Sequence, residues 1–222
     1  MGTGWSSSVL ARLRWRLLPR LALLALVTLG TGIVLSVLLG FLLGDDVAGG
    51  PVPGFGWLLL VVVFTTPLQS AAEEYLFRGY LSQAIASWVR APRVGAVLAA
   101  VVTATLFSLA HVPPDFLTFL DRFVFGLGAS AVVWLTGGLE GAIVLHAVNN
   151  VLVFVLAGAL GDGVGTEEVP QGGGPFFVTL SVLSVAGYVA LVARSRRTLQ
   201  PELLTPARDL RGSGSPMPAP AG

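Results

Sequence analysis

The segment Ala71-Ala72-Glu73-Glu74-Tyr75-Leu76-Phe77-Arg78-Gly79-Tyr80 sets two adjacent carboxylates and an arginine inside a long apolar run. No charged residue occurs from Val47 to Ala72, and the next one after Arg78 is Arg90. Charges in such a run are costly in a membrane, and they usually face a protein interior or a water-filled cavity. This segment therefore predicts a polar site inside a hydrophobic bundle.

The composition indicates an integral membrane protein. Of 222 residues, 54% are hydrophobic and 11% are charged, whereas a soluble domain is typically about 25% charged. The mean hydropathy is +0.82. We expect an all-α, polytopic transmembrane helix bundle of about six spans, because a β-barrel would show short alternating segments. The chain holds no cysteine, which excludes disulfides, thiolate metal ligands and a cysteine nucleophile.

Six apolar runs define the expected spans. They cover about Leu17–Leu43, Phe55–Val89, Val94–His111, Phe116–Leu135, Ala142–Leu160 and Pro175–Ala193. The second run is about 35 residues long, or roughly 52 Å of helix, against a hydrocarbon core of about 30 Å. We therefore expect it to tilt, to extend into the cytoplasm or to break. Pro67 is the expected kink, which would make Pro67–Val89 a broken or re-entrant piece.

The distribution of charge predicts the orientation and the domain limits. Arginines cluster before the first span, at Arg90 and Arg93, and after the last span. The acidic residues of two other loops are Asp45, Asp46, Glu167 and Glu168. The positive-inside rule then places both termini in the cytoplasm of a multi-pass cell-membrane protein. We divide the chain into a basic lead (1–16), a transmembrane domain (17–197) and a Pro-, Gly- and Ser-rich tail (198–222), expected to be disordered.

Helical spacing gives the two adjacent carboxylates different environments. Glu74 and Arg78 are four residues apart, in the favourable order for an ion pair on one helix face. Glu73 lies about 100° around the helix from Glu74. It is the less compensated carboxylate and therefore the better candidate for a general base. The alternative interpretation is a buried ion-pair cluster that holds two helices together.

The chain contains only two histidines, His111 and His146, and both fall in or at the ends of apolar spans. Asn150 follows His146 by four residues, with Asn149 between them. An imidazole and a carboxamide on one helix face suit two roles. They could bind a divalent metal such as zinc together with Glu73, or donate hydrogen bonds to a developing oxyanion. For the two asparagines, interhelical hydrogen bonding is the alternative.

Three short motifs resemble those of the CPBP family of intramembrane proteases. The family includes CAAX prenyl proteases of the Rce type and bacterial abortive-infection (Abi) proteins. The motifs are Glu73-Glu74-x-x-x-Arg78, Phe107-x-x-x-His111 and His146-x-x-x-Asn150. Phe125-Gly126 and the turn 136–139 also resemble the glycine-bearing span and turn of the family. The resemblance covers about residues 64–155, the motif-bearing core of the expected protease domain.

The resemblance implies a role for each motif residue. Glu73 would activate the attacking water, helped by His111. His146 and Asn150 would stabilise the oxyanion or take part in a metal site made with Glu73 and His111. Glu74 and Arg78 would support the geometry.

We therefore predict an intramembrane endopeptidase that hydrolyses a peptide bond in or near the membrane. Its expected partners are the lipid bilayer and a protein or peptide substrate, and no nucleic acid. One alternative is a non-catalytic immunity or scaffold protein that keeps the polar cluster. Another is a small transporter that uses Glu73 and the histidines as a relay, although no inverted repeat is evident.

Overall fold

The computed structural model describes residues 3–43, 49–161 and 174–205, and these ranges are helical with short connections and no strand. The long helices are α1 (Leu18–Leu43), α2 (Phe55–Glu74), α4 (Pro92–Ala110), α5 (Phe116–Thr136), α6 (Glu140–Leu160) and α7 (Pro175–Leu199). The shorter ones are η1 (Thr3–Ser6), η2 (Trp15–Leu17), η3 (Tyr75–Leu81) and α3 (Ser82–Ala86). Six helical segments in the described ranges are long and apolar enough to cross a membrane. The expected polytopic helical bundle is confirmed.

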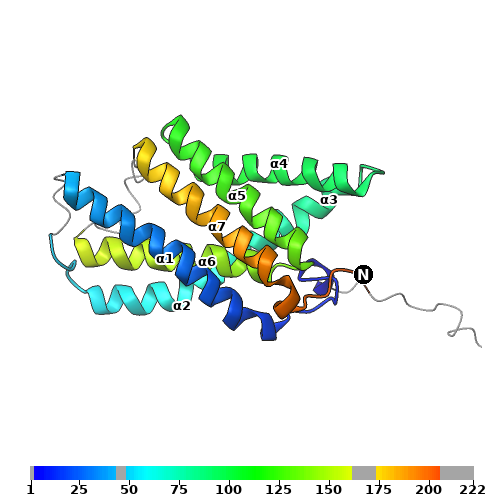
Figure 1. The fold of residues 1–222 in the computed structure, drawn as a ribbon, viewed down its shortest axis with the longest axis horizontal. Helices are drawn as coiled ribbons and strands as arrows, with labels where there is room; N and C mark the ends of the chain where they lie inside the picture. Colours follow the sequence, from blue (N-terminus) through cyan, green and yellow to red (C-terminus); the bar gives the residue numbers. More distant parts are fainter. Residues whose placement is uncertain (1–2, 44–48, 162–173, 206–222) are drawn as a thin grey trace, which may run out of the picture.

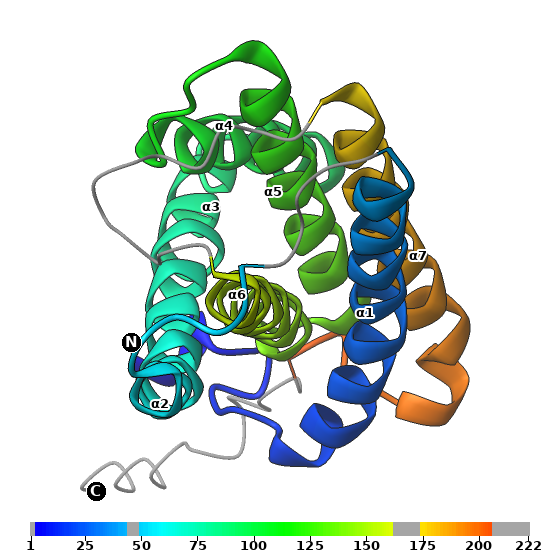
Figure 2. The ribbon, with the colours of Figure 1, turned by 90° about the vertical axis from the view of Figure 1, so that its left-hand side faces the viewer.

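The second apolar run is one continuous helical segment, and its irregularity does not lie at Pro67 as expected. Pro67 sits inside α2, where it removes one N–H donor without ending the helix. The regular α-helix gives way later, because the seven residues of η3 are π-helical and begin directly after Glu74. In Figures 1 and 2, α2 and α3 point in different directions, so the segment turns around η3. Such wide turns often occur at functional sites.

The central helix of the bundle is α6, which the other helices surround (Figure 2). It packs against α1, α2 and α5, and α7 packs against α1 and α5. The apolar core lies between these helices and includes the fully buried Leu21, Val132 and Leu145. Across the core, the Tyr188 hydroxyl of α7 donates a hydrogen bond of 3.0 Å to the Gly141 carbonyl of α6. The helix that carries the third motif is therefore held from several sides.

The connection into and out of α5 follows the sequence signals, with one correction. Asp115 caps the start of α5 and accepts hydrogen bonds of 2.9 Å from both the amide and the hydroxyl of Thr118. These bonds lower the pKa of Asp115. Gly137 ends α5 with φ 69°, a conformation that costs glycine little. We expected the next span to begin at about Ala142; instead α6 begins at Glu140, which is fully buried.

The described part of the lead and the segment after α7 meet at one end of the bundle (Figure 1). α7 extends beyond its expected end at Ala193 and carries arginines in its last turn, where cations are favourable. After it, Glu202 forms a 2.7 Å ion pair with Arg16 of the lead. The limits of lead, domain and tail stay a prediction. Residues 206–222 and four acidic loop residues lie outside the described residues: Asp45, Asp46, Glu167 and Glu168.

Candidate active site

Glu74 is the buried carboxylate of the pair, and it joins two helices. It is completely buried at the end of α2. Its Oε1 accepts hydrogen bonds from Arg78 Nη1 at 3.0 Å and from His146 Nδ1 at 2.8 Å. The ion pair expected from the four-residue spacing therefore forms, and the same oxygen also holds the imidazole of α6.

Arg78 is held in place by α5 and by an aromatic ring. Its Nη2 donates to the Gly126 carbonyl at 3.1 Å, and its guanidinium carbon lies 4.7 Å from the centre of the Phe107 ring. Gly126 is needed for this approach, because a Cβ there would come within 2.9 Å of Ala104 and 3.0 Å of Arg78. The arginine of the first motif thus contacts the aromatic residue of the second.

Glu73, the residue before Glu74 in α2, is partly exposed. Its Oε2 lies 3.7 Å from His111 Nε2 and 3.8 Å from His146 Nε2. Its Oε1 accepts a hydrogen bond of 3.2 Å from Gln69 Nε2, one helical turn earlier. Residues from three different spans therefore converge on one carboxylate oxygen.

The Nδ1 atom of each imidazole already has a hydrogen-bond partner. His111 Nδ1 lies 2.8 Å from the Phe107 carbonyl oxygen, and His146 Nδ1 lies 2.8 Å from Glu74 Oε1. Carbonyl and carboxylate oxygens only accept hydrogen bonds, so both Nδ1 atoms carry the proton. In the neutral rings, both Nε2 lone pairs then face Glu73 Oε2.

Aromatic rings form the wall around His146. The ring centres of Phe107 and Phe125 lie 5.5 and 5.4 Å from the imidazole of His146, each in an edge-to-face arrangement. Phe107 also lies 4.5 Å from the ring of His111. The two histidines therefore share one aromatic neighbour, which fixes their relative position and shields His146 from water.

The asparagines and Arg122 lie around this centre. Asn149 Nδ2 donates to Asn150 Oδ1 at 3.3 Å, which leaves the Nδ2 protons of Asn150 as donors. No described contact joins Asn150 to Glu73, so only its position one turn after His146 links it to the site. Arg122 donates to the carbonyl of His111 at 3.0 Å.

The donor set of Glu73, His111 and His146 has the composition of a catalytic zinc site. In residues 3–43, 49–161 and 174–205, however, no three His, Cys, Asp or Glu side chains are arranged to hold a metal ion. The metal site that we considered from the sequence therefore stays a prediction.

Several buried polar atoms of the site have no hydrogen-bond partner among the described residues. They are Glu73 Oε2, Glu74 Oε2 and Arg78 Nε. Leaving such an atom unpaired costs about 1–3 kcal/mol. Buried polar atoms are rarely left so, and a cluster of them is typical of a site that completes its hydrogen bonds with another molecule.

Sequence reasoning missed two contributors to this site. Gln69 contacts Glu73 from four residues earlier in α2, a spacing that could have revealed it. Arg122 holds the backbone of His111 from eleven residues away, for which the helical pattern gives no signal.

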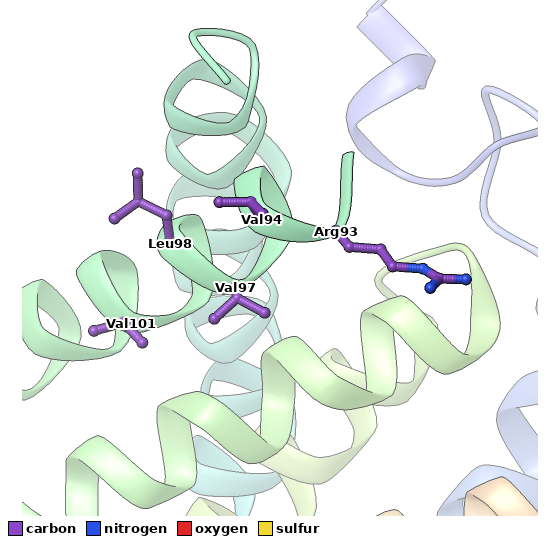
Figure 3. A pocket seen from close by; sticks show the side chains of 5 residues that line it. All are labelled: Arg93, Val94, Val97, Leu98 and Val101. Carbon is purple, nitrogen blue, oxygen red and sulfur yellow. The ribbon is translucent and has the colours of Figure 1, made fainter. Parts of the chain in front are cut away.

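A shallow hollow of about 500 Å³ on α4 lies outside the site. It is lined by Arg93, Val94, Val97, Leu98 and Val101 (Figure 3), none of which belongs to the site.

Among the comparisons with known proteins, one family model matches the chain. Residues 54–152 match the family model described as type II CAAX prenyl endopeptidase Rce1-like. This match includes all three motifs and confirms the predicted resemblance to this family of membrane proteases. No curated protein and no solved structure matches the chain.

Proposed function

We propose that this chain, whose residues 54–152 form an Rce1-like domain, is an active intramembrane endopeptidase that hydrolyses peptide bonds with a water molecule activated by Glu73. The substrate class is a peptide segment held at the membrane, and the family description suggests prenylated peptides as first probes. The observation that carries the proposal is the convergence of Glu73 Oε2 and two imidazole Nε2 atoms from three spans.

The spacing of these three atoms suits a bridging water. Distances of 3.7 and 3.8 Å are too long for direct hydrogen bonds. All three atoms are acceptors when the rings are neutral, so they favour a molecule that brings its own protons. A water between them would donate to Glu73 and to one histidine and keep a lone pair for attack.

The hydrolysis then proceeds with balanced proton transfers. The water oxygen bonds to the peptide carbonyl carbon, and Glu73 takes the proton that the water loses. His111 orients the water through Nε2, because its Nδ1 is fixed on the Phe107 carbonyl. When the carbon–nitrogen bond breaks, Glu73 returns the proton to the leaving amine.

We assign oxyanion stabilisation to His146 and Asn150. His146 Nδ1 donates to Glu74, which orients the ring and would stabilise the imidazolium formed if Nε2 takes a proton during the reaction; that Nε2–H would then donate to the developing negative charge. The free Nδ2 protons of Asn150 are available for the same purpose. Arg78 fixes Glu74 and compensates its charge.

The depth of the site fits a membrane-held peptide. His146 follows the first residue of α6, Glu140, by a rise of about 9 Å at ~1.5 Å per residue. The arginines of the lead and of the end of α7 lie at this same end of the bundle. By the positive-inside rule, we place this end and both termini in the cytoplasm and the protein in the cell membrane.

The test uses the purified full-length chain in liposomes and a panel of quenched fluorescent peptides, each made with and without a farnesylated cysteine. We expect the wild type to cleave at least one peptide. Glu73→Gln should lower kcat/KM by about 10²–10⁴-fold because the general base is lost, with an unchanged melting temperature. The matched control is Glu202→Gln, the same chemical change at a partly exposed carboxylate outside the site.

Retained cleavage by purified Glu73→Gln would overturn the proposed role of Glu73. A folded wild type that cleaves no peptide in the panel, and that leaves the membrane-peptide profile of expressing cells identical to that of Glu73→Gln, would favour the scaffold alternative. The active preparation is also assayed for zinc. Stoichiometric zinc whose removal abolishes cleavage would replace the metal-free steps above.

A further inference from the structure

The N-terminal lead folds against the end of the bundle that carries the site. Ser7 and Ser8 are 7% and 5% exposed. The Val9 amide donates to the Gly137 carbonyl at 3.0 Å, and the Leu139 amide donates to the Ser7 carbonyl at 2.8 Å. The lead therefore binds the turn between α5 and α6, directly before the helix that holds His146.

The same segment also contacts η3, which follows the catalytic carboxylates. The hydroxyls of Ser7 and Tyr75 form a hydrogen bond of 2.7 Å. Tyr75 is the first residue of η3 and directly follows Glu74. Nearby, a Cβ on Gly79 would come within 3.2 Å of the Ser6 carbonyl oxygen, so this stretch of η3 packs closely against the lead.

A buried ion pair anchors the segment. Arg14 Nε and Nη2 donate to the two carboxylate oxygens of Glu140 at 2.9 and 2.6 Å, and the Arg14 amide adds a bond of 2.8 Å. Burial lowers the pKa of Arg14, but the hydrogen bonds and charges of Glu140 and Glu202 together raise it more, so the net shift is upward. Because Glu140 is the first residue of α6, the anchor fixes the lead to the His146 helix.

We propose that residues 5–14 are a strap that sets the position of η3 relative to α6, with Ser7 and Tyr75 as positioning residues for the peptidase reaction. The inference rests on the proposed function and concerns a segment outside the matched residues 54–152. The strap bridges α6, which carries His146, and η3, which begins two residues after Glu73. Glu73 Oε2 lies 3.8 Å from His146 Nε2, so a shift of η3 relative to α6 would act close to this pair.

The test compares Ser7→Ala, Tyr75→Phe and their double variant in the full-length chain, with the farnesylated and unmodified peptides as probes. Each single variant should lower kcat about three- to ten-fold with KM unchanged, the expected effect of one lost hydrogen bond. The double variant should be no worse than either single one, because both remove the same bond. The control is Tyr80→Phe, the same change at an exposed tyrosine of η3.

Hydrogen exchange supplies a measurement that does not depend on activity. Amides of residues 75–86 should exchange faster in Ser7→Ala and Tyr75→Phe than in Tyr80→Phe, with melting temperatures within about 2 °C of each other. If the wild type cleaves no probe, faster exchange still supports the strap while the proposed function fails. Unchanged exchange together with unchanged kcat, or a full additive loss in the double variant, would overturn the strap.

Discussion

The bundle contains two clusters of buried arginine and glutamate, and they differ in how completely their hydrogen bonds are made. The site cluster consists of Glu73, Glu74, Arg78 and the two histidines. The end cluster consists of Arg14, Glu140, Arg16 and Glu202. Both central pairs are almost inaccessible, with side-chain exposures of 1% and 0% for Arg78 and Glu74, and 3% and 0% for Arg14 and Glu140.

In the end cluster every charged atom of the central pair is satisfied. All three guanidinium nitrogens of Arg14 donate, to Glu140 and to the carbonyls of Thr136 and Glu202. Both carboxylate oxygens of Glu140 accept. In the site cluster, Glu73 Oε2, Glu74 Oε2 and Arg78 Nε are buried without partners in the described part of the chain. A saturated cluster suits a purely structural role, whereas an incomplete one suits binding and chemistry.

Replacing each central pair by apolar side chains should give the largest contrast. Arg14→Met/Glu140→Met should lower cleavage by less than about ten-fold, because well-packed apolar residues often replace a buried ion pair without loss. Glu74→Met/Arg78→Met should lower kcat/KM by about 10²-fold or more, because His146 loses the carboxylate that orients it. The measurements are peptide cleavage and thermal unfolding of both double variants.

The contrast fails if the two double variants lose activity equally at equal stability. It would also fail if the Glu74/Arg78 variant kept its activity, since the pair would then serve only packing. Either result would mean that hydrogen-bond completeness does not separate the two clusters.

Breaking only one partner of the site pair should act mainly on stability. Glu74→Gln leaves Arg78 as a buried charge whose carboxylate is gone, and removal of one partner of a buried pair typically costs about 3–5 kcal/mol. We expect a lower melting temperature and lower expression than for Glu73→Gln, its neighbour with a partly exposed side chain. A stable, well-expressed but inactive Glu74→Gln would show that the two glutamates have exchanged roles.

The site cluster could be predicted from the sequence because its charges stand out locally. Glu74 and Arg78 are four residues apart on one helix, and only two histidines lie in the apolar runs. The end cluster could not, because Arg14 and Glu140 are 126 residues apart and each sits where a charge is ordinary. Arg14 fits a basic lead, and Glu140 fits a turn. The π-helical turn at η3 was also missed, since hydrophobic spacing carries no mark of a wide turn.

The smallest expected effect concerns Glu202, the partly exposed carboxylate of the end cluster, and it depends on pH. Burial raises the pKa of Glu202, but its main-chain amide and Arg16 lower it more, so it lies below the ordinary 4.5. The folded state therefore favours the carboxylate. Its stabilising contribution is complete above about pH 4.5 and is lost as the pH falls through the lowered pKa.

This contribution should stay below about 1 kcal/mol, because the Glu202 side chain is 37% exposed and surface ion pairs contribute little. We expect Glu202→Gln to melt slightly below the wild type near pH 7, and the difference to shrink as the pH falls below 4.5. The measurement is thermal unfolding of both proteins in the same detergent across this range. A difference that grows on acidification would mean that Glu202 binds its proton more tightly in the folded state. Glu202 would then destabilise the end cluster, and only Arg14 and Glu140 would make its stabilising hydrogen bonds.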